Sequence, residues 1–356
     1  MTTTAQQPES ETALGSQQQN GLLPVLEARN LTKHFYTGNA LSRRVVKAVQ
    51  EASFKLYRGR VTALVGESGS GKSTIVRMLA RLYEPTSGEI LFDGKNVLQE
   101  RGRMASLLYR SRVQMIFQDP FSSLNPVHKV KYNLERPLRL YGFHVGVRGK
   151  QAIQEQIGEL LRRVSLTPVE EFANKYPHQL SGGQRQRVAI ARALAVQPEV
   201  ILADEPISML DVSIRMGILN LMARLRDEQG IAFLYVTHDI ASARYFSDEI
   251  LVMYAGHIVE GAGSEELIQN PKHPYTQLLL SAVPDPARGL RTADVEVEGE
   301  IPSLAALGAG CPFAPRCPHV MEKCHAAMPP ITKLSDTRWT RCYLYENDGA
   351  ASKAAS

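Results

Sequence analysis

The feature that most constrains this chain is the segment VGESGSGKST at residues 65–74. The compact apolar run RVTALVG leads into it, as expected of a strand. The run STIVRMLARL follows with the period of a helix and places four apolar residues on one face: Ile75, Met78, Leu79 and Leu82. A strand, a glycine-rich turn and a helix in this order match the pattern G-x-x-x-x-G-K-[ST], which is typical of nucleotide phosphate sites.

The residue types in this turn suit a triphosphate and its metal ion. Glycines let backbone N–H groups point at phosphate oxygens, and the start of the following helix adds partial positive charge. Lys72 would neutralise the β- and γ-phosphates, and the Ser73 hydroxyl would bind Mg²⁺. We therefore predict that the whole turn binds the nucleotide: Gly66, Glu67, Ser68, Gly69, Ser70, Gly71, Lys72, Ser73 and Thr74.

Two acids end a second apolar run, VILADEP. Asp204 closes that expected strand and would hold Mg²⁺ directly or through water. Glu205 beside it could polarise the attacking water as a general base. Adjacent acids at a strand end can also be solvated loop charges. The phosphate-binding turn earlier in the chain favours the catalytic interpretation.

The order of the remaining patterns predicts the fold class. Short apolar runs alternate with helical patterns, which favours a parallel, doubly wound α/β sheet with ligands at the carboxyl ends of its strands. A mostly helical stretch at about 128–175 interrupts this alternation and would form a second lobe. The run EILVMYAGHIVEGA indicates a hairpin around Ala255 and Gly256. Because no stretch approaches 18 consecutive apolar residues, we expect no membrane span.

The segment QLSGGQRQRVAIARAL at residues 179–194 resembles the signature of ATP-binding cassette (ABC) ATPases. Other motifs of that family occur in order: LTKHF, IFQDP, SMLD and VTHD. The resemblance covers about residues 25–260. It implies an α/β fold with a RecA-like P-loop NTPase core, a β-subdomain and an inserted helical subdomain. ATP and Mg²⁺ are the cofactors that it implies.

The resemblance also implies roles for four residues outside the phosphate turn. Phe35 would stack on adenine, and Gln118 would be a catalytic residue that binds the metal and links the nucleotide to the helical lobe. Asp211 belongs to the loop that crosses between two subunits. His238 would be the catalytic switch histidine that senses the γ-phosphate.

The signature itself offers a second anion site. Ser181, Gly182 and Gly183 open a helix with Gln184 in its first turn, so backbone donors and the positive end of a helix face outward. Since the chain already has one phosphate site, we expect this second one to cap the nucleotide of a partner ABC ATPase subunit. Two such chains would close over two ATP molecules.

Two positions depart from the family pattern. Ile207 and Met209 stand in PISMLD where the usual sequence is PTSALD. Neither position is a phosphate, metal or base ligand in this interpretation, and both Glu205 and His238 are intact. We therefore expect altered packing at the subunit seam without loss of catalysis.

Residues beyond 265 resemble the ATPase subunits of bacterial dipeptide and oligopeptide importers, through NPKHPYTQLLLSAVPDP, GEIPSL and GCPFAPRCP. This resemblance implies a peripheral protein on the cytoplasmic face of the inner cell membrane. Its partners would be two transmembrane permease subunits, a second ABC ATPase and, indirectly, an extracytoplasmic substrate-binding protein. Relatives in this branch also move nickel and oligosaccharides, so those cargoes remain alternatives to peptides. The net charge of +5 is too mild to indicate a nucleic-acid partner.

We expect the chain to have four parts. Residues 1–22 are polar, Gln-rich and without periodicity, which is typical of a disordered leader. Residues 23–265 would form the ABC ATPase domain, with its helical subdomain at about 119–190. A region of the peptide-importer type would follow at 266–345, and a disordered tail at 346–356.

All four cysteines lie in the third part, with the spacing C-x5-C-x6-C-x17-C: Cys311, Cys317, Cys324 and Cys342. Structural zinc sites favour closer pairs, iron–sulfur clusters accept looser sets of four thiolates, and a cytosolic location disfavours disulfides. A [4Fe–4S] cluster, a zinc site and free buried thiols therefore remain open. We interpret the cysteines as stapling an appended tail that the ATPase core does not need. Arg316, His319 and His325 would be surface charges.

A soluble ABC ATPase acting on DNA or the ribosome is the main alternative function. Chromosome-structure relatives split the cassette with a long coiled coil, but only about 110 residues separate Lys72 from Ser181, without sustained heptads. Ribosome-acting relatives usually carry two cassettes in one chain, and this chain has one. The intact Glu205 also disfavours a non-catalytic nucleotide-binding regulator.

Overall fold

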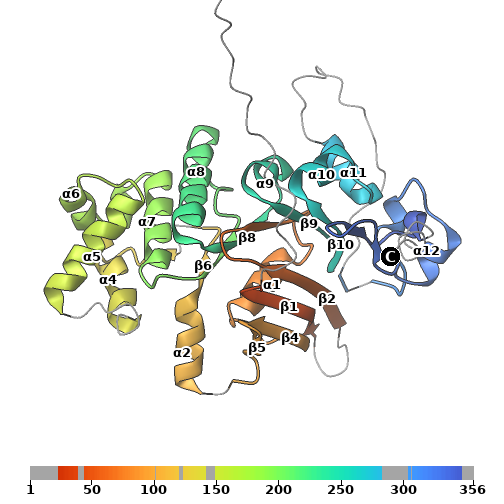
Figure 1. The fold of residues 1–356 in the computed structure, drawn as a ribbon, viewed down its shortest axis with the longest axis horizontal. Helices are drawn as coiled ribbons and strands as arrows, with labels where there is room; N and C mark the ends of the chain where they lie inside the picture. The colour runs from red at the N-terminus through yellow and green to blue at the C-terminus, as the bar shows by residue number, and fades with distance from the viewer. Residues whose placement is uncertain are drawn as a thin grey trace, which may run out of the picture.

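The computed structural model describes residues 23–38, 44–100, 102–119, 123–141, 149–282, 304–305 and 307–346. The leader predicted at 1–22 and nearly all of the tail predicted at 346–356 lie outside these residues. Figure 1 shows an α/β core with a helical lobe on one side and the C-terminal residues on the other. The predicted α/β class with an inserted helical lobe is confirmed.

The core is an eight-stranded sheet in the order β11-β12-β10-β9-β3-β8-β7-β6. Five neighbouring strands in it are parallel: β9 (Glu249–Tyr254), β3 (Val61–Val65), β8 (Ala232–Thr237), β7 (Val200–Asp204) and β6 (Val113–Ile116). Every residue of β3, β7 and β8 is buried, as expected of parallel strands covered on both faces. β10 (His257–Gly263) returns antiparallel to β9, which confirms the predicted hairpin.

A second, antiparallel sheet lies against the core in the order β2-β1-β4-β5. Its strands are β1 (Leu26–Thr37), β2 (Arg44–Leu56), β4 (Ser87–Phe92) and β5 (Lys95–Asn96). Apolar residues of this sheet cluster with α1 (Lys72–Leu79), α2 (Arg103–Arg112) and one face of the core strands. α1 ends at Leu79, so Leu82 lies beyond the helix and is 52% exposed, contrary to its predicted place on the apolar face.

The helical lobe falls between β6 and β7 in the chain. It consists of α4 (Val130–Tyr141), α5 (Lys150–Arg163), α6 (Val169–Asn174) and α7 (Gly182–Leu194). α7 packs against α8 (Val212–Gln229), and α9 (Ile240–Phe246) follows β8 (Figure 1). In the described part of the chain, no helix is both long enough and apolar enough to cross a membrane.

The C-terminal residues continue the core sheet. Their elements are α10 (Ser264–Gln269), α11 (Pro274–Ser281), α12 (Glu322–Ala326), β11 (Thr332–Lys333) and β12 (Trp339–Thr340). β12 pairs antiparallel with β10, and the Arg338 guanidinium lies 3.3 Å from the fully buried Glu260 carboxylate. Strands from both sides of the predicted boundary at residue 265 therefore share one sheet.

Candidate nucleotide site

The loop between β3 and α1 contains two close approaches that only glycine allows. At Gly66, a Cβ atom would lie 2.1 Å from the Met253 carbonyl oxygen on β9. At Gly71, φ is +111° and a Cβ atom would lie 2.2 Å from the Ala48 carbonyl oxygen on β2. A side chain at either position would displace the loop from the sheets that support it. The predicted turn from Gly66 to Thr74 thus joins the end of β3 to the start of α1.

Lys72 brings its ammonium group into this loop. Its Nζ donates to the carbonyl oxygens of Gly66 and Glu67, both at 2.8 Å, and the residue is 4% exposed. Burial lowers the pKa of Lys72, while Glu205, Asp204 and Glu67 act in the opposite direction. A buried cation in a site of reduced dielectric attracts phosphate more strongly than a solvated one.

The two residues predicted to hold Mg²⁺ are in contact. Ser73 Oγ, at the start of α1, donates to Asp204 Oδ1, at the end of β7, across 2.9 Å. Asp204 is 3% exposed, and burial raises the pKa of its carboxyl group while the Ser73 bond acts to lower it. A hydroxyl and a carboxylate are the oxygen ligands that Mg²⁺ prefers. The residues present therefore fit a magnesium ion bound with a nucleotide.

The three predicted catalytic residues meet at one oxygen atom. Glu205 Oε2 accepts a bond from Gln118 Nε2 at 3.0 Å and lies 3.3 Å from His238 Nδ1. Glu205 has φ of +46°, and its N–H donates to the Val236 carbonyl at 2.9 Å. A non-glycine residue in this backbone region is strained, and such strain is concentrated at functional sites. The carboxylate therefore lies where three strands end, β6, β7 and β8.

The signature residues form a separate surface on α7. Ser181 is the exposed N-cap of this helix, and its Oγ accepts a bond from the Gln184 N–H while Gln184 Oε1 accepts one from the Ser181 N–H. At Gly183, a Cβ atom would lie 2.6 Å from Ile214 Cγ2, at the start of α8. Asp211 is the N-cap of α8, so it adjoins the same surface. Figure 1 shows α7 in the helical lobe, well apart from α1.

Three other residues singled out from the sequence are Phe35, Ile207 and Met209. Phe35 lies in β1, where its ring packs edge-on against Tyr83 with 5.5 Å between ring centroids. Its contact with adenine stays a prediction. Ile207 is 4% exposed and packs in the core of its own chain, whereas Met209 is 58% exposed. The expected effect on a subunit seam therefore concerns Met209, and Ile207 acts through the core.

The four cysteines carry free thiols. Burial raises the pKa of the Cys311 and Cys342 thiols to about 11, and neighbouring cysteines add to the shift. All four lie in the described residues, among which no three His, Cys, Asp or Glu side chains are placed to hold a metal ion. The predicted [4Fe–4S] or zinc site therefore has no support among the described residues.

The prediction that Arg316 is a surface charge is wrong. Its side chain is 10% exposed, and its guanidinium lies 3.1 Å from the carboxylate of Glu67 in the phosphate loop. His319 and His325 are exposed, as predicted. Arg316 lies between Cys311 and Cys317 in the sequence. Its partner Glu67 lies 249 residues earlier, and no local motif indicates this pairing.

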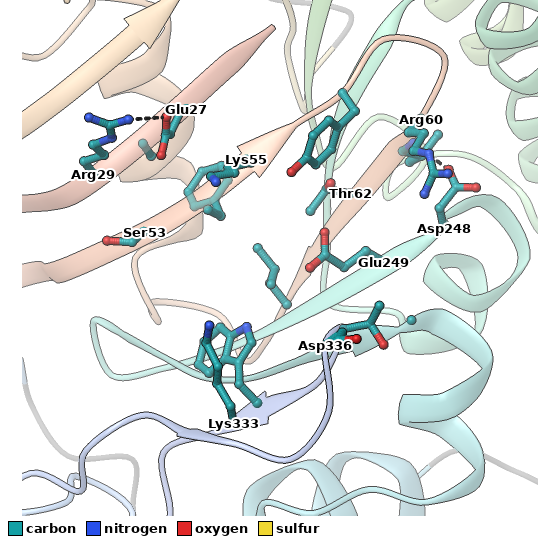
Figure 2. Close-up of a pocket in the computed structure, with 18 residues that line it drawn as sticks. Glu27, Arg29, Ser53, Lys55, Arg60, Thr62, Asp248, Glu249, Lys333 and Asp336 are labelled. Atoms are coloured by element: carbon teal, nitrogen blue, oxygen red, sulfur yellow. Dashed lines mark hydrogen bonds and ion pairs between the residues drawn. The ribbon is translucent and has the colours of Figure 1, made fainter. Parts of the chain in front are cut away.

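A separate cavity of about 390 Å³ lies at the opposite edge of the core sheet (Figure 2). Its walls include residues at the starts of β3 and β9 and residues near β11: Arg60, Thr62, Asp248, Glu249, Lys333 and Asp336. The phosphate loop follows the other end of β3. Because parallel α/β sheets bind their ligands at the carboxyl ends of the strands, we expect the nucleotide at the loop and not in this cavity.

Two family models match the chain. Residues 49–208 match the ABC transporter model, and residues 259–324 match the model of the oligopeptide/dipeptide transporter C-terminal region. The first match contains the phosphate loop, the signature and the acids at the end of β7. The fold and this site define an ATPase of the ATP-binding cassette class.

Similar proteins and structures support the same assignment. A putative oligopeptide transport ATP-binding protein of Bacillus subtilis, YkfD, is 41% identical over 329 residues, 91% of this chain and 97% of the relative. The Haemophilus influenzae dipeptide transport ATP-binding protein DppF is 40% identical over 322 residues, 90% and 96% of the two chains. The dimeric, post-hydrolysis cassette MJ0796 bound to ADP and Pi matches with a TM-score of 0.59 at 33% identity, covering 67% of this chain and 98% of that one. The chain therefore belongs to the ABC transporter family, among the peptide-transport ATP-binding subunits.

Proposed function

We propose that this chain binds and hydrolyses ATP to energise a multi-subunit importer of dipeptides or oligopeptides. The ATPase class follows from the family, and the names of the relatives support the peptide cargo. One observation carries the catalytic part of the proposal: Gln118 and His238 both approach the same oxygen of Glu205. The Ser73–Asp204 bond beside the phosphate loop supports a metal position there.

In this proposal, each residue has one chemical task. Lys72 and the loop N–H groups neutralise and orient the phosphates, while Ser73 and Asp204 hold Mg²⁺, with Gln118 as a further ligand. The bound MgATP supplies the γ-phosphoryl group that water attacks. Glu205 accepts the proton of that water, and His238, 3.3 Å from the same carboxylate, orients it and responds to the γ-phosphate.

The signature surface supports a pair of cassettes. The helix N-terminus at Ser181 is exposed and offers backbone donors to an anion, and the matched cassette MJ0796 is a dimer. We propose that Ser181, Gly182, Gly183 and Gln184 cap the ATP bound by a second cassette, which is either the same chain or a homologous one. Asp211 would lie at the seam between them.

The remaining partners follow from the transport role. We propose that two transmembrane permease subunits hold the cassette pair at the cytoplasmic face of the cell membrane, and that an extracytoplasmic binding protein delivers the cargo. Nickel or oligosaccharide import by the same machinery is the alternative.

Reconstitution tests the function directly. The assembled complex, in vesicles loaded with ATP and Mg²⁺ on the cassette side, should accumulate labelled dipeptide or tetrapeptide. Complex carrying Glu205→Gln should bind ATP yet accumulate none. Uptake of nickel or an oligosaccharide without peptide uptake would identify the alternative cargo, and uptake independent of ATP would refute the proposal.

A further inference from the structure

Glu67, in the phosphate loop, is held on three sides. Its carbonyl oxygen accepts a bond from Lys72 Nζ at 2.8 Å, and its N–H donates to the Tyr275 hydroxyl at 2.9 Å. Its carboxylate receives the Arg316 guanidinium. Lys72 belongs to the loop itself, but Tyr275 and Arg316 come from residues beyond 265. Two of the three restraints on this loop residue are therefore supplied by the C-terminal region.

The ion pair between Arg316 and Glu67 has two-pronged geometry. Arg316 Nη1 lies 3.1 and 3.3 Å from the two carboxylate oxygens, and Nη2 lies 3.3 Å from Oε1. The two side chains are 10% and 24% exposed, so water screens this pair less than a surface pair. Paired guanidinium–carboxylate bonds fix orientation as well as distance. The pair therefore restrains the direction of the Glu67 side chain.

Buried aromatic rings hold Arg316 in place. Tyr254, Tyr275 and Phe313 are each at most 1% exposed, and their ring centroids lie 4.5 to 5.5 Å apart. Arg316 Nη1 also lies 3.3 Å from the Tyr254 hydroxyl. Tyr254 ends β9, next to the Met253 carbonyl that Gly66 approaches. One packed cluster thus contacts the loop from the side of the sheet and from the C-terminal region.

We propose that Arg316 is a positioning residue of the ATP site, through which the C-terminal region keeps the phosphate loop in its nucleotide-binding form. In this proposal the C-terminal region contributes to the ATP site, unlike an appended tail that the ATPase core does not need. This inference rests on the phosphate loop binding ATP, as proposed above. Arg316 acts through Glu67 and need not touch the nucleotide.

The consequence for kinetics is specific. A loop that must be ordered when ATP arrives binds ATP more weakly, because part of the binding free energy is used to order it. The Glu205 carboxylate is contacted by Gln118 and His238, and its backbone N–H donates to the Val236 carbonyl; none of these contacts involves Arg316. Loss of Arg316 should therefore raise the Kd and KM for ATP and leave kcat nearly unchanged.

The experiment is a double-mutant cycle on the full-length chain, with ATP binding measured by titration and KM and kcat by phosphate release. Arg316→Ala should weaken ATP binding about tenfold, the loss expected for one hydrogen-bonded charged group. Arg316→Lys should recover part of the lost ATP affinity. Arg316→Ala placed in a Glu67→Gln background should add much less further loss, because the charge of the partner is already gone.

Controls separate this inference from simpler explanations. Lys323→Ala breaks the exposed Lys323–Glu346 ion pair in the same region and should leave ATP binding at the wild-type value. Equal losses from Arg316→Ala with and without Glu67→Gln would show a general structural role and overturn the inference, as would wild-type binding by Arg316→Ala. Lys72→Ala tests the proposed site itself: if it leaves binding intact, the site assignment fails, whatever Arg316 does.

Discussion

The phosphate loop and the signature segment each lead into the N-terminus of a helix, but they differ in what surrounds them. The loop is enclosed by its own chain: β9 and β2 crowd its glycines, and Tyr275 and Arg316 hold Glu67. The signature segment leaves Ser181 exposed, and its capping bonds run only to Gln184. In the proposed function, the loop is therefore an enclosed anion site that is complete within the chain, and the signature segment is an open site that a second molecule would complete.

The surroundings of the signature segment agree with this contrast. Met209, Val212 and Met216 are 58%, 76% and 42% exposed, and they lie beside or on the first turns of α8. Apolar side chains exposed together are typical of surfaces that another protein covers. The enclosed site should thus govern the binding of ATP, and the open site should govern hydrolysis that requires pairing.

The largest expected effect belongs to the enclosed site. Glu205→Gln should leave ATP affinity within about twofold and slow hydrolysis at least 100-fold, on the order of the loss of a general base. Phosphate release and nucleotide titration measure the two quantities. Glu265→Gln, which alters an exposed acid paired with Arg244, serves as the matched control. Turnover near the wild-type rate in the Glu205 variant would remove this residue from the mechanism.

A change at the open site should affect only the hydrolysis that depends on pairing of two cassettes. Ser181→Asp keeps a good N-cap for α7 but places a negative charge where a partner's phosphate would bind. We expect unchanged thermal stability, ATP binding within about twofold, and hydrolysis reduced about tenfold or more through like-charge repulsion. Wild-type turnover should rise more than linearly with protein concentration when dilute, and the variant should lose this dependence. Full activity in diluted, monomeric variant protein would break the comparison.

The enclosed site was largely predictable from sequence, because its parts carry local signals. The glycines, Lys72 and Ser73 follow one another in the chain, and Asp204 and Glu205 end an apolar strand. Parallel strands bring their carboxyl ends to one edge, so the meeting of Ser73 with Asp204 follows from the fold class. Gln118 and His238 were placed by family resemblance and also reach that edge.

The support of the loop was not predictable in the same way. The Arg316–Glu67 pair joins residues 249 positions apart. No sequence pattern around Arg316 predicts a contact at that distance along the chain. β11 and β12 have two residues each, too few to show an alternating pattern, so the extension of the core sheet was missed. Leu82 fits the helical period but follows the end of α1, since ends are set by local capping.

The cavity of Figure 2 tests whether a residue outside the proposed ATP site changes stability without changing ATP turnover. Glu249 lines the cavity of Figure 2, and burial raises the pKa of its carboxyl group to about 7, above its value in the unfolded chain. The folded state therefore favours the protonated form, and this contribution to stability is lost as pH rises from about 4.5 to 7. Glu249→Gln should remove that dependence.

The measurement is the free energy of unfolding of both proteins from pH 4.5 to 8. Wild-type protein should lose on the order of 1 kcal/mol relative to Glu249→Gln across this range, less than the full shift implies because water reaches part of the side chain. ATP turnover at pH 7 should be equal. Parallel stability curves for the two proteins would show that folding leaves the pKa of Glu249 unchanged.

The smallest expected effects on stability and turnover concern Ile207 and Met209, the two residues that depart from the usual family sequence. Met209→Ala removes an exposed side chain, so we expect a change of at most about 0.5 kcal/mol in stability and less than about twofold in turnover. Ile207→Thr brings a hydroxyl into a buried position and should cost about 1 kcal/mol with the same small effect on turnover. Chemical denaturation and the concentration dependence of turnover separate the two. A tighter or weaker pairing in Met209→Ala, with stability unchanged, would locate the subunit seam at this side chain. A loss of stability there instead would mean that Met209 packs within its own chain and that the open surface begins elsewhere on α8.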